Sequence, residues 1–328
     1  MVFFITVLRA LAACLITNAH YGPIYPIDIL ANGGLIGDII FFAVSGYCLY
    51  NVKLNFPRWY GKRLWRIYLP VFLITVLYLA LGAYSLSQHP INWWLVYPTY
   101  YHFVASIVVL YIPFYFVCKI EKLRENIPLI MGILAAVIMG VYVFVYDKSY
   151  YHIDVVREPF IRLLFMESML LGGWFKKNDA KLRNCSKKIW LKILGAVGCF
   201  GAYFASKLFF SRYPQFSDFQ LINWVTIFAL LYFVFSLFAS LDNKLEKLPK
   251  FIKSVINLIA TITLEIYLVQ YVLIDLVAEK QLMFPLNWVV ITGLIVVSAY
   301  VLHIVCKFIY RAVDKVIKFV KSKVEIKG

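Results

Sequence analysis

The feature of this sequence that most constrains its fold is a succession of long apolar blocks separated by short charged stretches. Such blocks are too long for the strands of a soluble core and too apolar for helices on a soluble surface. Hydrophobic residues make up 62% of the 328 residues and charged residues 15%, whereas a soluble domain averages about 45–50% and about 25%. We therefore predict an all-α, polytopic membrane protein with about ten transmembrane helices. The predicted spans are residues 2–20, 33–50, 67–85, 100–118, 128–146, 161–175, 189–209, 221–241, 255–279 and 287–310.

The distribution of Lys and Arg gives this arrangement an orientation. If the N-terminus is cytoplasmic, the inner segments 51–66, 119–126, 176–188, 242–253 and 307–328 hold 25 of the 33 basic residues. The outer segments 21–32, 86–99, 147–160, 210–220 and 280–286 hold 4, and the remaining 4 lie within spans. Basic residues concentrate on the cytoplasmic side of membrane proteins. The split therefore predicts cytoplasmic N- and C-termini in a multi-pass protein of the cell membrane, with a bacterial plasma membrane as the expected location.

The net charge of +16 is explained by the same orientation, because anionic lipid head groups attract a basic cytoplasmic surface. A nucleic-acid partner is the weaker explanation and is not expected. Residues 1–310 form one predicted membrane domain, and residues 311–328 form a basic, amphipathic cytoplasmic tail. The six cysteines, Cys185 among them, avoid the outer segments and show no zinc-type spacing, so neither a disulfide framework nor a metal site is predicted.

Two residues of the first predicted helix, Arg9 and His20, are the clearest candidates for chemistry. They are eleven residues apart, which places them about 20° apart around a helix and about 16 Å apart along it. Arg9 could reach the inner surface by snorkelling and His20 could rest in the interface, but an intramembrane cation aligned with an imidazole favours function. The pair suits a long ligand with an anionic head and a reactive tip, such as coenzyme A. Neutral His20 could act as a general base, and Arg9 could hold a phosphate or stabilise an oxyanion.

The spacing of Arg9 and His20 resembles the R-X10-H signature of the acyltransferase-3 family of integral membrane O-acyltransferases. Further motifs of that family have counterparts along the whole chain. They are Gly37–Tyr47 (GDIIFFAVSGY), Arg63–Pro70 (RLWRIYLP), Arg162–Gly173 (RLLFMESMLLGG) and Ile266–Gln270 (IYLVQ). The family commonly has His at the last of these positions, where this chain has Gln270.

The resemblance implies an O-acyltransferase that moves an acyl group, most often acetyl, from cytoplasmic acyl-CoA to a hydroxyl of a capsular, exopolysaccharide or other surface sugar. Acetyl-CoA would be a co-substrate, and no tightly bound cofactor is expected. The resemblance implies that Arg63, Arg66 and Tyr68 contact the coenzyme. The two arginines share a helix face, which suits phosphates, although anchoring in lipid head groups is the simpler explanation of such a basic segment.

The remaining candidates are polar residues within the predicted spans. Asp38 could fix the tautomer of His20 or have a structural role, and Ser45 is expected to bond its own helix rather than act as a nucleophile. Arg162 and Glu167 lie about 140° apart on their helix, so each needs another partner. We predict that a polar network lines a central cavity, consisting of Ser45, Arg162, Glu167, Glu265, Tyr267 and Gln270. Of the other histidines, His89 and His152 are expected to be solvated, and His303 is expected to face lipid head groups.

Two other functions remain open at this level. A transporter or exporter of glycans or small solutes would also have intramembrane charges and short outer loops, although no internal repeat is evident. Succinyl transfer would use the same machinery as acetyl transfer. The sequence also does not choose between direct transfer and an acyl-His20 intermediate.

Overall fold

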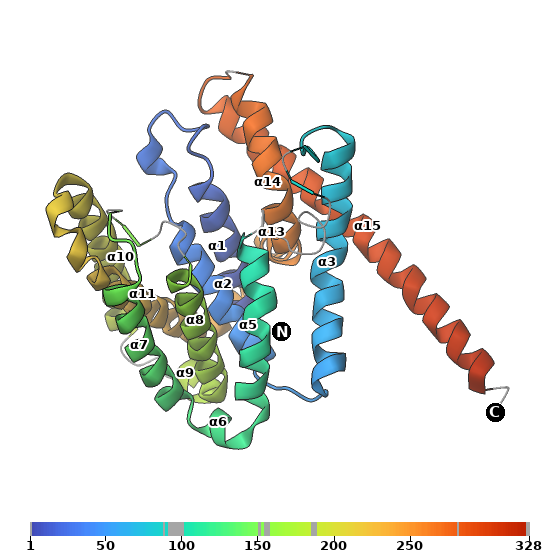
Figure 1. Cartoon of the computed structure of the whole chain (residues 1–328), viewed down its shortest axis with the longest axis horizontal. Coiled ribbons are helices and arrows are strands. Elements are labelled where there is room, and N and C mark those ends of the chain that lie inside the picture. Colours follow the sequence, from blue (N-terminus) through green and yellow to red (C-terminus); the bar gives the residue numbers. More distant parts are fainter. Residues whose placement is uncertain are drawn as a thin grey trace. The chain divides into compact units, whose positions relative to one another are not determined.

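Helices form the secondary structure of the described chain, and no strand occurs in it. The computed structural model describes residues 2–87, 89–90, 102–149, 152–153, 158–184, 189–280 and 282–325. In chain order the elements (Figure 1) are α1 (Phe3–Ala19), η1 (Asp28–Leu30), α2 (Gly34–Leu49), α3 (Phe56–Ala80), α5 (His102–Lys119), α6 (Glu121–Glu125), α7 (Ile127–Phe144), α8 (Phe160–Lys177), α9 (Asp179–Asn184), α10 (Ile189–Arg212), η2 (Pro214–Phe219), α11 (Leu221–Ser240), α12 (Asp242–Leu245), α13 (Lys250–Thr261), α14 (Thr263–Ala278) and α15 (Leu286–Glu325).

Some sequence predictions lie outside the described residues. They are most of the outer segment 86–99, parts of segments 147–160 and 176–188 with Cys185, and the last residues of the tail.

Each predicted span coincides with a helix or with an interrupted pair of helices. Six segments are long and apolar enough to cross a bilayer, and the pair α13 and α14 would make a seventh if it counts as one span. The six are Asp28–Leu49, Phe56–Ala80, Ile127–Phe144, Ile189–Arg212, Leu221–Ser240 and Leu286–Ile317. Helix α1 and residues Phe103–Lys119 are apolar but shorter. The all-α, multi-pass class is therefore confirmed, whereas the count of ten and the cytoplasmic termini stay predictions.

The prediction of one continuous helix over residues 255–279 is wrong. The chain leaves helical geometry at Ile262, which divides the segment into α13 and α14. Three consecutive β-branched residues, Thr261 to Thr263, occupy the break, and β-branched side chains are stiff and lower helix propensity. The hydroxyl of Thr261 also bonds the carbonyl oxygen of Asn257 at 2.6 Å, a local bond that can bend a helix.

Two other helices differ from their predicted bounds. Helix α3 begins at Phe56 rather than at residue 67, so the basic residues expected in a loop form its first turns. It ends at Ala80 rather than at residue 85. Helix α15 continues to Glu325 with no interruption at the predicted domain boundary at residue 310. The functional division into a membrane domain and a tail stays a prediction.

The described chain forms two compact units. Unit 1 comprises residues 1–19, 32–60 and 106–261, and unit 2 comprises residues 20–31, 61–105 and 262–328.

Unit 1 is built around the close approach of α2 and α8. A Cβ atom on Gly46 would lie 2.0 Å from the carbonyl oxygen of Met169, and one on Gly172 would lie 1.9 Å from that of Ala43. The two backbones touch because neither glycine has a side chain. Helix α1 packs on α2 in a similar way, since a Cβ atom on Gly37 would lie 2.9 Å from the carbonyl oxygen of Ala12. Gly37 and Gly46, both in the Gly37–Tyr47 motif, therefore serve the close packing of helices.

Unit 2 is organised by α14, α15 and the second part of α3. The hydroxyl of Tyr78 on α3 donates to the carbonyl oxygen of Val269 on α14 at 3.1 Å. The segment after α1 joins α15, because the amide of Asn287 donates to the carbonyl oxygen of Ile24 at 2.7 Å. These hydrogen bonds pair polar groups that would otherwise be buried without a partner, and they link neighbouring segments of unit 2.

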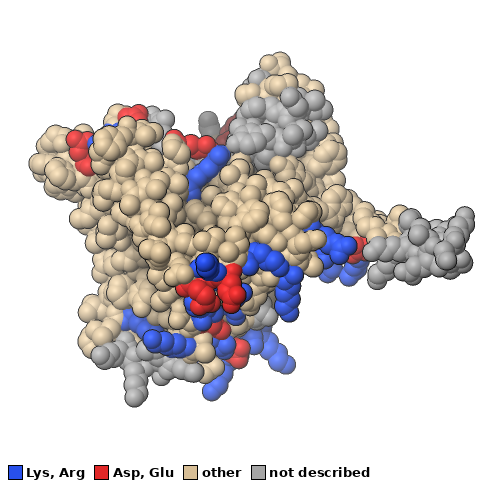
Figure 2. All heavy atoms as spheres, turned by 60° about the horizontal axis from the view of Figure 1, so that its bottom comes forward, with Lys and Arg blue, Asp and Glu red and all other residues tan. Residues whose placement is uncertain are grey.

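Large apolar side chains cover much of the outer surface of the helices. Examples are Leu129 and Ile133 on α7, Leu194 on α10 and Val297 on α15, which are 59–63% exposed. Figure 2 shows charged side chains gathered in groups, with broad uncharged surface between them. Exposed apolar patches of this extent are rare on soluble monomers. They are the surfaces that lipid tails cover.

Candidate functional site

The predicted site residues fall in both units. Arg9, Asp38, Ser45, Arg162 and Glu167 belong to unit 1, and His20, Arg63, Arg66, Tyr68, Glu265, Tyr267 and Gln270 belong to unit 2.

Helix α1 carries Arg9, and His20 follows its last residue, Ala19. The regular helix means that the chain from Arg9 to Ala19 keeps the predicted helical rise and turn. Arg9 is half-buried, and its guanidinium makes no hydrogen bond or ion pair to the described residues. A partly buried cation without a carboxylate partner is the kind of group that binds an anionic ligand.

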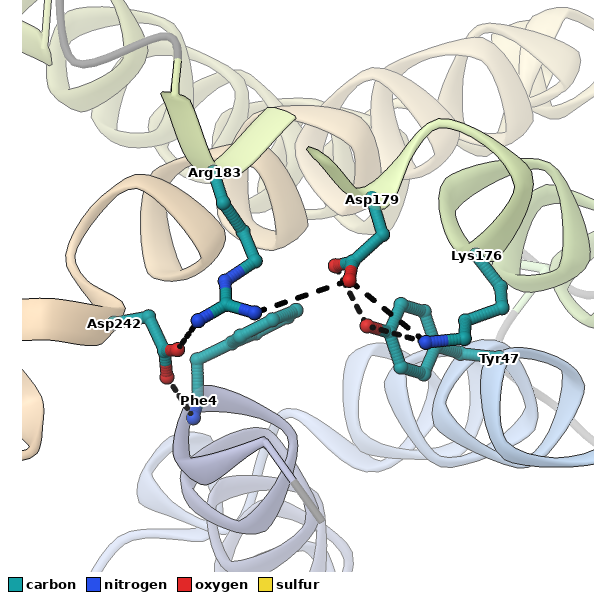
Figure 3. Close-up of polar contacts among 6 residues, drawn as sticks. All are labelled: Phe4, Tyr47, Lys176, Asp179, Arg183 and Asp242. Carbon is teal, nitrogen blue, oxygen red and sulfur yellow. Dashed lines mark hydrogen bonds and ion pairs between the residues drawn. The ribbon is translucent and has the colours of Figure 1, made fainter. Parts of the chain in front are cut away.

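The first turn of α1 is held by a carboxylate that the sequence did not single out. Oδ1 of Asp242, which is 1% exposed, accepts a hydrogen bond from the backbone N–H of Phe4 at 2.8 Å. The other oxygen, Oδ2, lies 2.6 Å from Nη2 of Arg183 (Figure 3). A carboxylate at a helix N-terminus satisfies an orphan N–H and complements the helix dipole. Asp242 therefore fixes the end of the helix that carries Arg9.

Asp179 extends the same cluster toward α2. Its Oδ1 accepts a hydrogen bond from the Tyr47 hydroxyl at 2.6 Å, and its Oδ2 lies 3.9 Å from Nη1 of Arg183 (Figure 3). Lys176 lies 3.8 Å from the same carboxylate and places its ammonium 4.6 Å from the centre of the Tyr47 ring. With Asp242, two carboxylates face two cations, so the cluster has no excess charge for a phosphate. It positions α1, α2 and α8 rather than binding an anion.

His20 contacts α14 in unit 2. Its Nε2 lies 3.2 Å from the hydroxyl oxygen of Tyr271, and the two rings meet edge to face at 4.7 Å between centroids. A hydrogen bond to one ring nitrogen sets which tautomer the imidazole adopts. Tyr271 was not predicted from the sequence. Its position next to Gln270, in a motif already singled out, was the only signal that could have found it.

Tyr267 and Gln270 lie in the same helix as Tyr271. The ring of Tyr267 packs against those of Tyr271 and Phe103, at 5.6 Å and 5.0 Å between centroids. The side chain of Gln270 is 0% exposed, and neither its Nε2 nor its Oε1 has a hydrogen-bond partner among the described residues. Helix α14 thus brings a polar amide and two tyrosines to the histidine.

Arg63, Arg66 and Tyr68 lie on α3. Arg63 and Tyr68 are half-buried and Arg66 is exposed. The backbone oxygen of Arg66 accepts a hydrogen bond from the Tyr310 hydroxyl of α15 at 3.2 Å. Because both arginines lie in one continuous helix three residues apart, they share a face as predicted. Their contact with a coenzyme stays a prediction.

Two carboxylates of the predicted polar network have partners. Glu167 on α8 accepts a hydrogen bond from Nε1 of Trp224 on α11 at 2.9 Å, so its expected partner on another helix is confirmed. Glu265 on α14 lies 2.8 Å from Nδ1 of His303 on α15. The prediction that His303 faces lipid head groups is therefore wrong, because the buried carboxylate of Glu265 gives it a protein partner.

Two of the further predictions about polar residues, those for His152 and Ser45, need correction. Arg162 has an ion-pair partner close in the chain, Glu158, four residues earlier. His152, expected to be solvated, is 0% exposed and packs edge to face on Tyr203 at 5.1 Å between centroids. Ser45 makes no hydrogen bond to its own helix or to other described residues. The Asp38 carboxylate is half-buried and likewise has no hydrogen-bond partner in the described chain.

The fold and these contacts define a multi-pass helical membrane protein with a polar histidine environment inside a largely apolar bundle. The family model described as "Acyltransferase domain" matches residues 2–306. The chain therefore belongs to the acyltransferase-3 family of membrane acyltransferases. No curated protein and no solved structure matches it significantly.

Proposed function

We propose that this membrane acyltransferase moves an acetyl group from cytoplasmic acetyl-CoA to a hydroxyl of a cell-surface polysaccharide or lipid-linked sugar. The observation that carries the proposal is Arg9 within α1 and His20 directly after the last residue of that helix, in a chain of this family. An anion-binding cation and a base at that spacing suit a coenzyme with phosphates at one end and a thioester at the other.

The donor would be held through its phosphates. Arg63 and Arg66 on α3 supply two guanidinium groups on one helix face. Arg9 on α1 is a separate candidate for binding a phosphate. Guanidinium groups form bidentate, charge-assisted hydrogen bonds to phosphate oxygens. The lack of a carboxylate partner for Arg9 among the described residues supports this role.

His20 would act as the general base. With its Nε2 held by the Tyr271 hydroxyl, 3.2 Å away, Nδ1 is left to accept the proton of the sugar hydroxyl. The sugar oxygen then forms a bond to the thioester carbonyl carbon, and the carbon–sulfur bond breaks. The leaving thiolate takes the proton back from the imidazolium, so His20 ends each cycle neutral. An acyl-His20 intermediate would use the same residue as a nucleophile, and succinyl-CoA could replace acetyl-CoA as the donor.

The test compares His20→Ala and Arg9→Ala in cells that carry the acceptor polysaccharide. We expect His20→Ala to lower surface O-acetylation at least about 100-fold, the usual contribution of a general base. Arg9→Ala should raise the KM for acetyl-CoA in isolated membranes. His89→Ala, in the predicted outer loop, is the matched histidine control, and immunoblotting of the membrane fraction corrects for protein amount. Full O-acetylation by the His20→Ala protein would exclude the assigned base.

A further inference from the structure

Gln270 carries a buried amide that the described chain leaves unsatisfied. Its side chain is 0% exposed, and neither Nε2 nor Oε1 is hydrogen-bonded to a described residue. More than about 90% of buried polar groups in proteins have a partner, and an orphaned group costs several kcal/mol, all the more in hydrocarbon. The partner of this amide is therefore expected to be a molecule that the protein binds.

Thr75 on α3 shows the same pattern in unit 2. It is 0% exposed, and its Oγ1 has no partner among the described residues. A helical threonine ordinarily donates to the carbonyl oxygen four residues earlier. Thr226, Thr261 and Thr292 do so at 2.6–2.7 Å. The hydroxyl of Thr75 makes no such bond.

A direct contact joins the two helices next to both residues. The Tyr78 hydroxyl donates to the carbonyl oxygen of Val269 at 3.1 Å. Thr75 lies one helical turn before Tyr78 on α3, and Gln270 follows Val269 on α14. Residues three apart lie on the same side of a helix. The two unsatisfied groups therefore belong to the same region of the contact between α3 and α14.

The chemistry of this region favours a neutral ligand with several hydroxyl groups. An amide offers two donors and one acceptor oxygen, and a threonine hydroxyl both donates and accepts. Phosphates, in contrast, select guanidinium and ammonium groups. The neighbouring tyrosines are also neutral and amphipathic: Tyr78 packs on Tyr84 at 5.3 Å, and Tyr267 packs on the apolar ring of Phe103 at 5.0 Å. Such rings combine an apolar face with a polar edge, as a sugar ring requires.

We propose that Gln270 and Thr75 bind hydroxyl groups of the acceptor sugar, which makes the contact between α3 and α14 its subsite. The inference rests on the proposed function and adds which residues receive the sugar. Gln270 directly precedes Tyr271, whose hydroxyl lies 3.2 Å from Nε2 of His20. A sugar bound there lies on the element that holds the proposed base.

The experiment measures binding before it measures transfer. The probe is the surface polysaccharide of the source cell, de-O-acylated with mild alkali and cut to oligosaccharides. Calorimetry on detergent-purified protein gives the Kd of this probe and, separately, that of acetyl-CoA. The variants are Thr75→Val and Gln270→Met, which approximately keep side-chain volume, and Thr226→Val is the control because its hydroxyl already bonds its own helix. Thermal unfolding without ligand is recorded for each protein.

We expect each variant to raise the Kd of the oligosaccharide about tenfold, as the loss of a hydrogen bond implies. The Kd of acetyl-CoA and the control variant should stay within twofold of the wild type. Unfolding temperatures should not fall, because the groups removed have no described protein partner.

Three results would overturn the inference. Unchanged oligosaccharide affinity would show that no sugar binds these groups. A raised Kd for acetyl-CoA alone would assign them to the amide groups of the donor's arm, and a fall in unfolding temperature of several degrees would show a partner within the protein. The proposed function fails separately, if the wild type transfers no acetyl group to the oligosaccharide. If the wild type transfers acetyl groups and the variants bind the oligosaccharide normally, the proposed function stands and only the sugar subsite is excluded.

Discussion

Individual polar side chains within the helices divide into those with a protein partner and those without one in the described chain. Glu167 and Glu265 have an indole and an imidazole as partners, and these bonds hold neighbouring helices together. Arg9, Thr75 and Gln270 have no such partner among the described residues. Because an unsatisfied polar group is costly in a membrane protein, the second group is where ligands are expected to bind.

The hydroxyl of Tyr271 is predicted to position the imidazole of His20, and a substitution can separate this role from simple packing. Tyr271→Phe keeps the ring that packs on His20 at 4.7 Å and removes the hydroxyl at 3.2 Å from Nε2. Without that hydroxyl the imidazole is no longer held in one tautomer. We expect kcat to fall about tenfold, less than the loss of about 100-fold or more expected when a general base is removed, with the KM for acetyl-CoA unchanged. Steady-state kinetics on purified protein give both constants.

The control for that prediction is Tyr60→Phe, which removes a hydroxyl that bonds the carbonyl oxygen of Val108 at 3.1 Å within unit 1. Its kcat should match the wild type. A positioning role for this hydroxyl would be excluded if the kcat of Tyr271→Phe were unchanged. It would also be excluded if the activity fell only because less of the variant was folded.

At the scale of elements, strongly apolar segments could be predicted from the sequence, whereas their interruptions and extensions could not. Hydropathy marks the length of an apolar block, so α2, α7 and α11 begin and end within two residues of their predicted bounds. It does not mark where a helix continues into polar residues, as α3 does before residue 67. The break at Ile262 leaves no mark in the hydropathy pattern, because the residues on both sides of it are apolar or nearly neutral.

The candidate site was predictable to a similar extent. The helix that carries Arg9 and the sharing of a face by Arg63 and Arg66 follow from the sequence pattern, whereas the alignment of Arg9 with His20 stays a prediction. The partners of polar residues depend on which helices meet in space, which one sequence does not determine. Asp242 at the start of α1 and Tyr271 beside His20 are therefore contacts that only the structure shows.

The close contact between α2 and α8 predicts that a side chain added between these helices destabilises the protein. A Cβ atom on Gly172 would lie 1.9 Å from the carbonyl oxygen of Ala43, closer than any real contact and against backbone that cannot rotate away. We expect Gly172→Ala to lower the free energy of unfolding by at least about 2 kcal/mol, the usual cost of overpacking. Thermal unfolding in detergent and the yield of membrane-inserted protein measure the effect.

Gly132→Ala is the matched control, because nothing lies within 4 Å of the Cβ atom it would add on α7. It should be neutral or slightly stabilising, since alanine favours helix more than glycine does. Equal stability of the two variants would mean that α2 and α8 do not approach as closely as described.

For the whole molecule, the predicted transmembrane topology depends on whether helix α8 crosses the membrane. Its composition excludes it from the six segments that could cross by length and apolarity alone, because Arg162, Glu167, Lys176 and Lys177 lie within it. Yet Arg162 pairs with Glu158 and Glu167 with Trp224, and the two lysines occupy its last turn, where snorkelling is inexpensive. A helix whose charges are paired or terminal can cross. The predicted alternation of basic inner and neutral outer segments requires that it does.

Labelling of single cysteines in a variant without its six natural cysteines tests this threading. Cysteines at the exposed positions Asp28 and Gln215 are predicted to lie outside, and those at Lys122 and Lys247 inside. A membrane-impermeant maleimide should therefore label the first two in intact cells and the second two only after permeabilisation. Between Lys122 and Gln215 the chain contains α7, α8 and α10 as spans, so opposite labelling of these two positions requires an odd number of crossings. If Gln215→Cys is protected in intact cells as Lys122→Cys is, one of the three helices does not cross. The polar composition of α8 then makes it the helix that stays within one leaflet, and the predicted count of ten falls with it.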